Sequence, residues 1–262
     1  MKRKLSVGDT LNEVFSIYGA HAGVLLPVAF WLFLAVAILN GIAGSHVVFL
    51  PLVIIVSTIA GTLYQGMVVG LVRDVQAGKS DSSVSELFDY AMPVILPLIG
   101  AGLLAGIGIG IGLILVVVPG LFLLTIWALI APAIVIEHQR VIDSFKRSRE
   151  LVRGNGWPVF GAIVVAFLIA FVGSAIFAAI AAAIADGWAL RIVFSALAST
   201  ITAPIGALVA GVLYYRLLAI GGPAAVPGAA GPVDPPLAPS PQEMPSPPAS
   251  PDPPPPLAPP AS

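Results

Sequence analysis

Long apolar runs alternate with short polar segments over the first 220 residues of the chain. A helix needs about 20 residues to cross a hydrocarbon core roughly 30 Å thick, and most of these runs are close to that length. The apolar stretch from Pro93 to Ile136 is too long for one crossing, and Pro119-Gly120 is the expected division within it. The pattern therefore predicts six membrane-spanning helices, near residues 22–43, 47–72, 93–117, 120–136, 158–185 and 188–215.

Amphipathic segments precede the first, third and fifth of these spans. Residues 5–20, a segment beginning at Ser83, and residues 140–153 each gather their apolar side chains on one helical stripe. Ser6 with Asp9, and Ser83 with Glu86, have the spacing of a capping box. We expect three short cytoplasmic helices lying on the membrane, each followed by a two-span hairpin.

A short pattern recurs in the three amphipathic segments. Val, any residue, an acid, any residue, then Leu or Phe occur at residues 7–11, 84–88 and 141–145. Gly-x-Leu-x-x-Gly also occurs twice, at 61–66 and 206–211. The pattern favours three parallel copies of one helix-then-hairpin unit. It fits equally well the alternative that amphipathic helices entering a membrane carry similar residues.

Composition agrees with a membrane protein. Hydrophobic residues make up 58% of the 262 residues, charged residues make up 10%, and the mean hydropathy is +1.02. Such a chain cannot cover a globular surface with polar groups. The absence of cysteine excludes a disulfide framework and a thiolate metal site, and His21 and His46 are predicted on opposite sides of the membrane. We expect no cofactor, no metal and no nucleic-acid partner.

The last part of the chain has a different composition. Proline accounts for 17 of the last 41 residues, with PxxP spacings such as Pro236 to Pro239. We expect residues 1–220 to form the six-span domain and residues 221–262 to form a disordered, proline-rich cytoplasmic tail. The tail is a flexible spacer in one interpretation and a docking segment for a cytosolic protein in another.

Basic residues are distributed very unequally between the two predicted sides of the membrane. Only Arg191 lies on the side away from the N-terminus. The Lys and Arg residues on the N-terminal side are residues 2, 3, 4, 73, 79, 140, 146, 147, 149, 153 and 216. By the positive-inside rule both termini are cytoplasmic. We expect a multi-pass membrane protein with this orientation.

Five of these cations lie in the third amphipathic segment: Arg140, Lys146, Arg147, Arg149 and Arg153. Arg147 is expected to face water together with Lys146 and Arg153. Near an anionic bilayer surface each cation contributes roughly 1 kcal/mol of attraction, so these residues are candidates for contact with anionic lipid. The alternative is that they act only as positive-inside signals.

Alternate glycines interrupt the third span between residues 102 and 112. The run lacks the Lys-Ser/Thr of a phosphate-binding loop, and a lone strand in lipid would leave its backbone groups unpaired, so a helix is predicted. On that helix Gly102, Gly106 and Gly110 share one face, and Gly108 with Gly112 share another. Both faces favour close packing of neighbouring helices.

No catalytic constellation is evident. The span interiors contain no Asp, Glu, Lys, Arg or His, which argues against a proton-coupled transporter. Glu137 and His138 are the nearest approach to an acid–base pair, but adjacent residues on a helix point about 100° apart. We interpret them as a helix-end cap and an interfacial anchor.

The stretch LVVVPGLFLLTIWALIAPAIVIEHQRVIDSFKRSRELVRGNGWPVFG, at 115–161, resembles the multi-span membrane domain fused to some bacterial glycerophosphodiester phosphodiesterases and its stand-alone relatives. LSVGDTLNEVFSIYG at 5–19 and LYYRL at 213–217 agree with it, whereas His138-Gln139 replaces a Gly-containing turn. The resemblance implies a six-span bacterial membrane protein. It implies no phosphodiesterase activity, because that activity belongs to a separate barrel domain.

Three functions fit these observations. The first is a membrane scaffold that binds a partner or lipid, and the second is a transporter or exporter of an apolar or lipid-like substrate. A membrane enzyme is the third, and we expect the chain not to be one. The sequence leaves the oligomeric state open.

Overall fold

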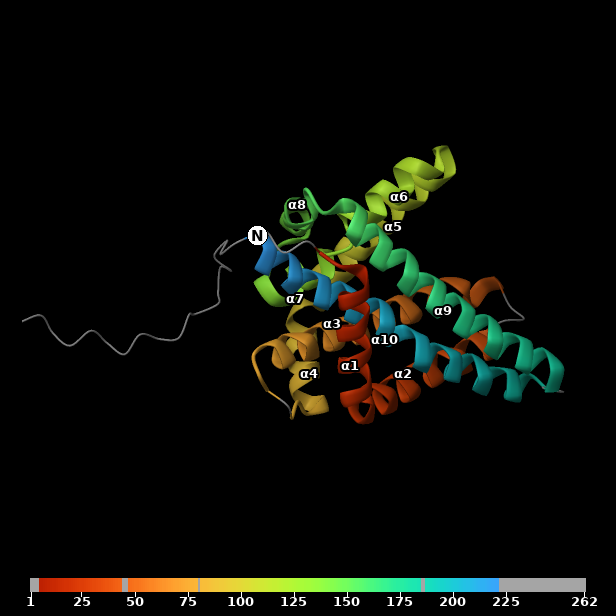
Figure 1. The fold of residues 1–262 in the computed structure, drawn as a ribbon. Helices are drawn as coiled ribbons and strands as arrows, with labels where there is room; N and C mark the ends of the chain where they lie inside the picture. Colours follow the sequence, from red (N-terminus) through yellow and green to blue (C-terminus); the bar gives the residue numbers. More distant parts are fainter. Residues whose placement is uncertain (1–4, 44–46, 80, 185–186, 222–262) are drawn as a thin grey trace, which may run out of the picture. The chain divides into compact units, whose positions relative to one another are not determined.

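Helices make up nearly all of the chain that can be described. The computed structural model describes residues 5–43, 47–79, 81–184 and 187–221, so the predicted tail and the basic residues 2–4 lie outside it. Within these ranges there is no strand. The elements (Figure 1) are α1 Val7–Ala20, α2 Ala22–Ala43, a 3₁₀ turn Val47–Phe49, α3 Leu50–Gln76, α4 Val84–Ala91, a 3₁₀ turn Met92–Val94, α5 Ile95–Leu115, α6 Val117–Ile126, α7 Ile130–Glu137, α8 Val141–Val152, α9 Gly156–Ile184 and α10 Trp188–Gly221.

Six stretches of the described residues are long and apolar enough to cross a membrane. They are Ala22–Ala43, Leu50–Gln76, Val84–Leu115, Val117–Glu137, Gly156–Ile184 and Trp188–Gly221. Large apolar side chains point outward from them, as in Trp31, which is 70% exposed, and Ile114, which is 87% exposed. Such surfaces suit lipid and not water, which fits a multi-pass membrane protein.

The third and fourth spans differ from the sequence prediction. The chain turns at Val116, which is extended (φ −154°, ψ 129°), and not at Pro119-Gly120. Pro119 lies instead in the first turn of α6, where its missing N–H breaks no helical hydrogen bond. The fourth span is also divided into α6 and α7, with a turn at 127–129 between them.

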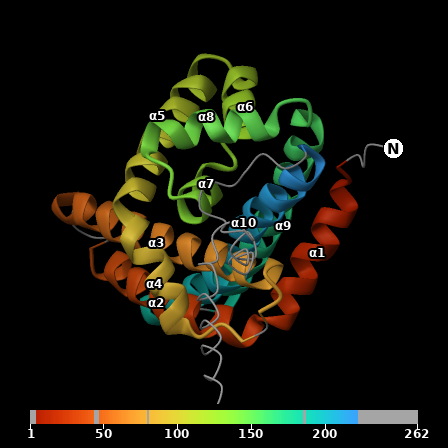
Figure 2. The ribbon, with the colours of Figure 1, turned by 90° about the vertical axis from the view of Figure 1, so that its left-hand side faces the viewer.

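Two long helices and the short α7 meet in the centre of the bundle. α3, α7 and α10 contact one another, and each has fully buried apolar side chains, such as Val68, Ile134 and Leu208. The other long helices lie around this centre: α2 contacts α3 and α10, α5 contacts α3 and α6, and α9 contacts α10 and α6 (Figure 2).

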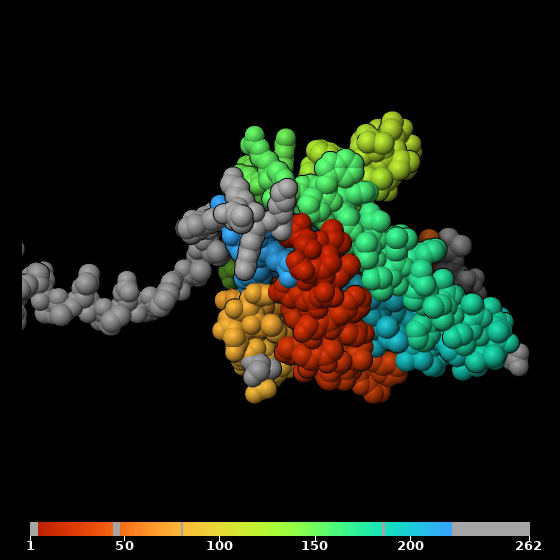
Figure 3. Space-filling view, viewed as in Figure 1, coloured from red at the N-terminus to blue at the C-terminus, as the bar shows by residue number. Residues whose placement is uncertain are grey.

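Each of the three amphipathic helices packs against one of the central helices. α4 packs against α3, α8 against α7, and α1 against α10, the last helix of the chain. α1 also runs along the surface beside α9 (Figure 3). In Figure 1, α1, α4 and α8 lie on the side of the bundle opposite to the end where α9 finishes and α10 begins.

The repeated Gly-x-Leu-x-x-Gly motifs place their final glycine at a close helix contact. A Cβ at Gly66 would lie 3.0 Å from the Cβ of Ala91 in α4, and one at Gly211 would lie 3.0 Å from Val72 of α3. The first glycines, Gly61 and Gly206, have no such neighbour within 4 Å. Glycine at the later position allows the neighbouring helix to approach the backbone closely.

Candidate functional site at helix α8

Helix α8 is fastened to the break between α6 and α7. The Ser148 hydroxyl donates to the carbonyl oxygen of Ile126 at 2.7 Å and accepts from the amide of Leu129 at 3.1 Å. Beside it, the rings of Trp127 and Phe145 meet edge to face at 4.9 Å. A break in an apolar helix leaves backbone groups without helical hydrogen bonds, and such groups need other partners. The Ser148 hydroxyl is the partner of two of these groups, the Ile126 carbonyl and the Leu129 amide.

A buried ion pair holds α8 to the centre of the bundle. Arg147 Nε lies 2.8 Å and 2.9 Å from the two carboxylate oxygens of Glu137, whose side chain is 0% exposed. The hydroxyl of Tyr214 and, at 3.2 Å, the amide of Gln139 also donate to this carboxylate. A buried charge is tolerated when it is paired and hydrogen-bonded in this way.

These contacts correct two sequence predictions. Arg147 does not face water, because its side chain is only 16% exposed. Glu137 is buried in the bundle and is not an interfacial anchor. His138 does end α7, in the left-handed region (φ 52°), with its side chain exposed. One Arg147 nitrogen, Nη2, is buried without a hydrogen-bond partner among the described residues.

The opposite side of α8 lines an open cleft of about 630 Å³. Lys146, Arg149 and Arg153 contribute three cations from successive turns, and Glu150 contributes one acid. The remaining wall is apolar or lacks side chains, and its residues are Phe122, Ile126, Val152, Gly154 and Gly156. The cleft therefore joins a cationic rim to an apolar surface.

Two of the cleft cations have no acid partner in the part of the chain that the structure describes. Lys146 lies 3.4 Å from Asp143, whereas Arg149 and Arg153 make no ion pair within those residues. α8 thus carries positive charge that the described protein does not neutralise.

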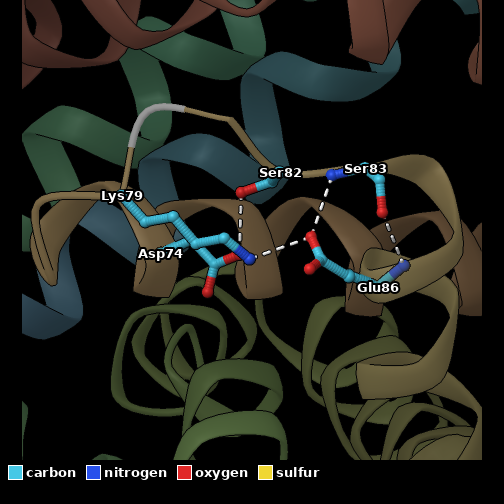
Figure 4. Close-up of polar contacts among 5 residues, drawn as sticks. All are labelled: Asp74, Lys79, Ser82, Ser83 and Glu86. Atoms are coloured by element: carbon cyan, nitrogen blue, oxygen red, sulfur yellow. Dashed lines mark hydrogen bonds and ion pairs between the residues drawn. The ribbon is translucent and has the colours of Figure 1, made fainter.

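The α4 junction shows the contrasting arrangement (Figure 4). Lys79 Nζ lies 2.9 Å from Glu86 and 3.8 Å from Asp74, and the Ser82 hydroxyl donates to Asp74 at 2.7 Å. The hydrogen bond from Lys79 to Glu86 raises the pKa of Lys79 above its usual value. Glu86 also closes the predicted capping box with Ser83. Lys79, the cation of this junction, therefore has two internal acid partners.

The α1 junction is neutralised as well. Arg216 donates to the Glu13 carboxylate at 2.7 Å and to the carbonyl oxygen of Asp9 at 2.8 Å. Gln76 of α3 donates to the other Glu13 oxygen at 2.7 Å. Among the three amphipathic helices, α8 is therefore the one with surplus cations in the described residues.

The predicted lipid-contact residues separate into three groups. Lys146, Arg149 and Arg153 converge on the cleft, whereas Arg147 is turned into the bundle. Arg140 is the N-cap residue of α8 and is exposed, but it does not line the cleft. Lipid contact at these residues stays a prediction.

The two predicted glycine faces of α5 have different surroundings. A Cβ at Gly108 would lie 2.7 Å from the Trp127 ring, and one at Gly112 would lie 3.0 Å from Gly120. By contrast, Gly102, Gly106 and Gly110 have no neighbour within 4 Å of such a Cβ among the described residues. Gly102 and Gly106 line a groove of about 500 Å³ between α3 and α5, together with Ser57, Thr58, Gly61, Thr62, Gln65, Leu103 and Ile107.

Metal binding has no support in the described ranges, where no group of three or more His, Asp or Glu side chains could hold an ion. Sequence reasoning missed the Glu137–Arg147 pair and the bridging role of Ser148. One signal was available: Glu137 is an acid at the end of an apolar span, and an acid there needs a cation nearby.

The described residues form helices without a strand, and their six long apolar stretches indicate a multi-pass membrane protein. Residues 5–218 match a family described as a domain of unknown function (DUF7847), and the chain belongs to that family. No curated protein and no solved structure matches it. The resemblance to the phosphodiesterase-linked membrane domain is not part of this match and stays a prediction.

Proposed function

We propose that the protein is a membrane scaffold that binds anionic lipid in the α6–α8 cleft. The observation that carries this proposal is the pair Arg149 and Arg153, two cations that make no ion pair with any acid among the described residues and lie beside an apolar wall. Anionic phospholipids supply both an acidic headgroup and apolar chains. Ordinary positive-inside signalling requires the charges but not their convergence on a cleft.

This proposal includes the bacterial inner membrane as the location, with both termini cytoplasmic. The distribution of basic residues supports that orientation, and so does the position of α1, α4 and α8 on one side of the bundle (Figure 1). In this orientation the cleft opens toward the cytoplasmic leaflet, where anionic lipid headgroups attract cations.

The proposed architecture is a ring of three units: α1–α3, α4–α7 and α8–α10. Each unit is an amphipathic helix followed by a hairpin. The contacts that support this are cyclic, because α4 lies on α3, α8 on α7 and α1 on α10. The first long helix of each unit also touches the unit before it, as α5 touches α3, α9 touches α6, and α2 touches α10.

The lipid proposal is tested by native mass spectrometry of the detergent-purified protein titrated with phosphatidylglycerol or with zwitterionic phosphatidylcholine. Wild type is expected to retain phosphatidylglycerol preferentially, and the double variant R149Q/R153Q is expected to lose that preference. R140Q/R191Q removes the same charge at two exposed arginines that do not line the cleft and serves as the control. If both double variants lose the phosphatidylglycerol preference equally, net charge explains the preference and the cleft is not the binding site.

The scaffold function includes a cytosolic protein partner for the tail. Its test is affinity purification from native membranes with and without residues 222–262. A stoichiometric soluble protein that is lost with the tail is the expected result. If the full chain and the chain without residues 222–262 co-purify with the same proteins, the tail does not bind a partner.

A transporter of an apolar or lipid-like substrate is the second candidate. The groove between α3 and α5 favours it, because Ser57, Thr58, Thr62 and Gln65 bring polar groups into a membrane-facing surface. Thr58 hydrogen-bonds its own helix at 2.7 Å, so the groove is only partly available to a substrate. For an enzyme, the Glu137 carboxylate is occupied by three donors and is closed to solvent, which argues against a catalytic role.

A further inference from the structure

We infer that the lipid in the α6–α8 cleft carries two phosphodiester groups, one for Arg149 and one for Arg153. This inference rests on the proposed lipid binding and specifies its ligand. A dianionic phospholipid of the cardiolipin type, in which a short glycerol bridge joins two phosphatidyl groups, has this chemistry.

The spacing of the two arginines suits two phosphates. Arg149 lies in the last turn of α8 and Arg153 is its C-cap residue, whose amide still bonds the carbonyl of Arg149, so the two backbones are about 6 Å apart along the helix axis and the side chains leave from the same side. A guanidinium is a planar fork that binds phosphate oxygens in pairs. Two forks on one face, one turn apart, match two phosphates joined by a short bridge.

The charge of the cleft points to the same ligand. Lys146 is paired with Asp143, and Glu150 makes no ion pair with Arg149 or Arg153 among the described residues, so the cleft presents two unpaired guanidinium groups. A monoanionic headgroup would leave one arginine unpaired beside Phe122 and Ile126. Because an unpaired charge against an apolar wall is unfavourable, two negative charges complement the cleft better than one.

The apolar side of the cleft requires a ligand with chains. Phe122 is 61% exposed, and Val118 on the same helix is 71% exposed, so apolar surface continues along α6 away from the arginines. At the other rim, a Cβ on Gly154 or Gly156 would meet no atom within 4 Å, which leaves room beside the arginines for a bulky headgroup. A soluble polyphosphate would match the charges but not this surface, so we commit to a lipid.

The inference predicts a specific pattern among single variants. Each near-surface cation is worth roughly 1 kcal/mol, which is about 5-fold in affinity. A cardiolipin that binds both arginines should lose about 5-fold in R149Q, about 5-fold in R153Q and about 25-fold in the double variant. Phosphatidylglycerol, which needs only one arginine at a time, should lose no more than about 2-fold in either single variant, because the other arginine still pairs its phosphate at roughly full strength.

Native mass spectrometry lipid titration of the full chain measures these affinities, with R140Q as the single-charge control and inorganic pyrophosphate as a soluble competitor. Tighter cardiolipin binding with the stated variant pattern is the expected result. If both lipids respond alike to each single variant, the two-phosphate inference is wrong while lipid binding stands. If neither lipid is preferred over phosphatidylcholine, the proposed function itself fails. If micromolar pyrophosphate displaces cardiolipin, the ligand of the cleft is a soluble polyphosphate and the inference of a lipid is wrong.

Discussion

Arg147 and Arg149 are two positions apart on α8 and have opposite environments. Arg147 is 16% exposed and bonded to a fully buried carboxylate, whereas Arg149 is exposed in the cleft without an acid partner in the described residues. Residues two apart on a helix point about 200° apart, which explains the contrast. From the sequence alone the five cations of this segment look equivalent. Their roles diverge only when the position of Glu137 is known.

Removing the buried Glu137 carboxylate tests whether the ion pair with Arg147 stabilises the fold. Glu137→Gln leaves Arg147 without its counter-charge, and we expect a loss of about 3–5 kcal/mol in the free energy of unfolding. SDS-titration unfolding in mixed micelles measures it. Glu150→Gln, at an exposed acid of the same helix, is the matched control and should change stability by less than about 0.5 kcal/mol.

The double variant Glu137→Gln with Arg147→Met separates charge from packing. It removes both charges, so it should recover part of the stability lost in Glu137→Gln alone. A double variant less stable than the single would contradict the interpretation that the buried, unpaired Arg147 causes the loss.

At the scale of elements, the sequence predicted the existence of the helices better than their interruptions. The apolar run at 22–43 is α2 with the same bounds, and the Ser83–Glu86 spacing is a capping box. The turn at Val116 and the break at 127–129 were not placed correctly, although Pro119 and Pro132 lie in the first turns of α6 and α7, where a proline removes the hydrogen bond to the carbonyl four residues before it. Ser148, nineteen residues beyond Leu129, then hydrogen-bonds two backbone groups at the second break, a contact that local sequence patterns do not reveal.

Two buried serines of α8 make it possible to test the role of this break. Ser148→Ala leaves the Leu129 amide unpaired, and we expect a cost of about 1–3 kcal/mol. Ser144→Ala should cost about 0.5 kcal/mol or less, because the Ser144 hydroxyl bonds a carbonyl of its own helix turn. SDS-titration unfolding measures both losses. If the two variants lose the same stability, the hydrogen bonds of Ser148 to the break contribute no more than an ordinary buried serine.

The two glycine faces of α5 offer a similar comparison. Gly108→Ala places a methyl group against the Trp127 ring and should destabilise the protein by about 1–3 kcal/mol. Gly106→Ala meets no neighbour among the described residues and should be neutral or stabilising by up to about 1 kcal/mol. Thermal unfolding in detergent compares the two. A destabilised Gly106→Ala would indicate that another molecule occupies that face.

At the scale of the whole molecule, the class of protein was readable from the sequence and the site was not. Six apolar runs predicted six helices able to cross a membrane, and the described structure has them. The cleft depends on which faces of α6 and α8 turn toward each other, and one-dimensional periodicity does not fix that. The proposed ring depends likewise on the contact between α1 and α10, whose residues are far apart in the sequence.

The membrane orientation has a direct test, because the chain contains no native cysteine. Ser85→Cys in α4 and Gly187→Cys just before α10 introduce single exposed thiols. In intact cells a membrane-impermeant maleimide should label Gly187→Cys and leave Ser85→Cys unlabelled until the membrane is opened. The reverse pattern would invert the proposed topology and move the cleft to the other leaflet.

The position of α10 in the centre of the bundle also has a consequence for synthesis. α2 packs against α10, and Gly41 of α2 lies against Ile192. At 5–20 residues per second the ribosome needs roughly 8–30 s to make the ~150 residues between them. During that time α2 stands in the bilayer without its main neighbour. The nascent protein stays open until its last helix is inserted, so truncation anywhere before α10 should leave a substrate for membrane proteases.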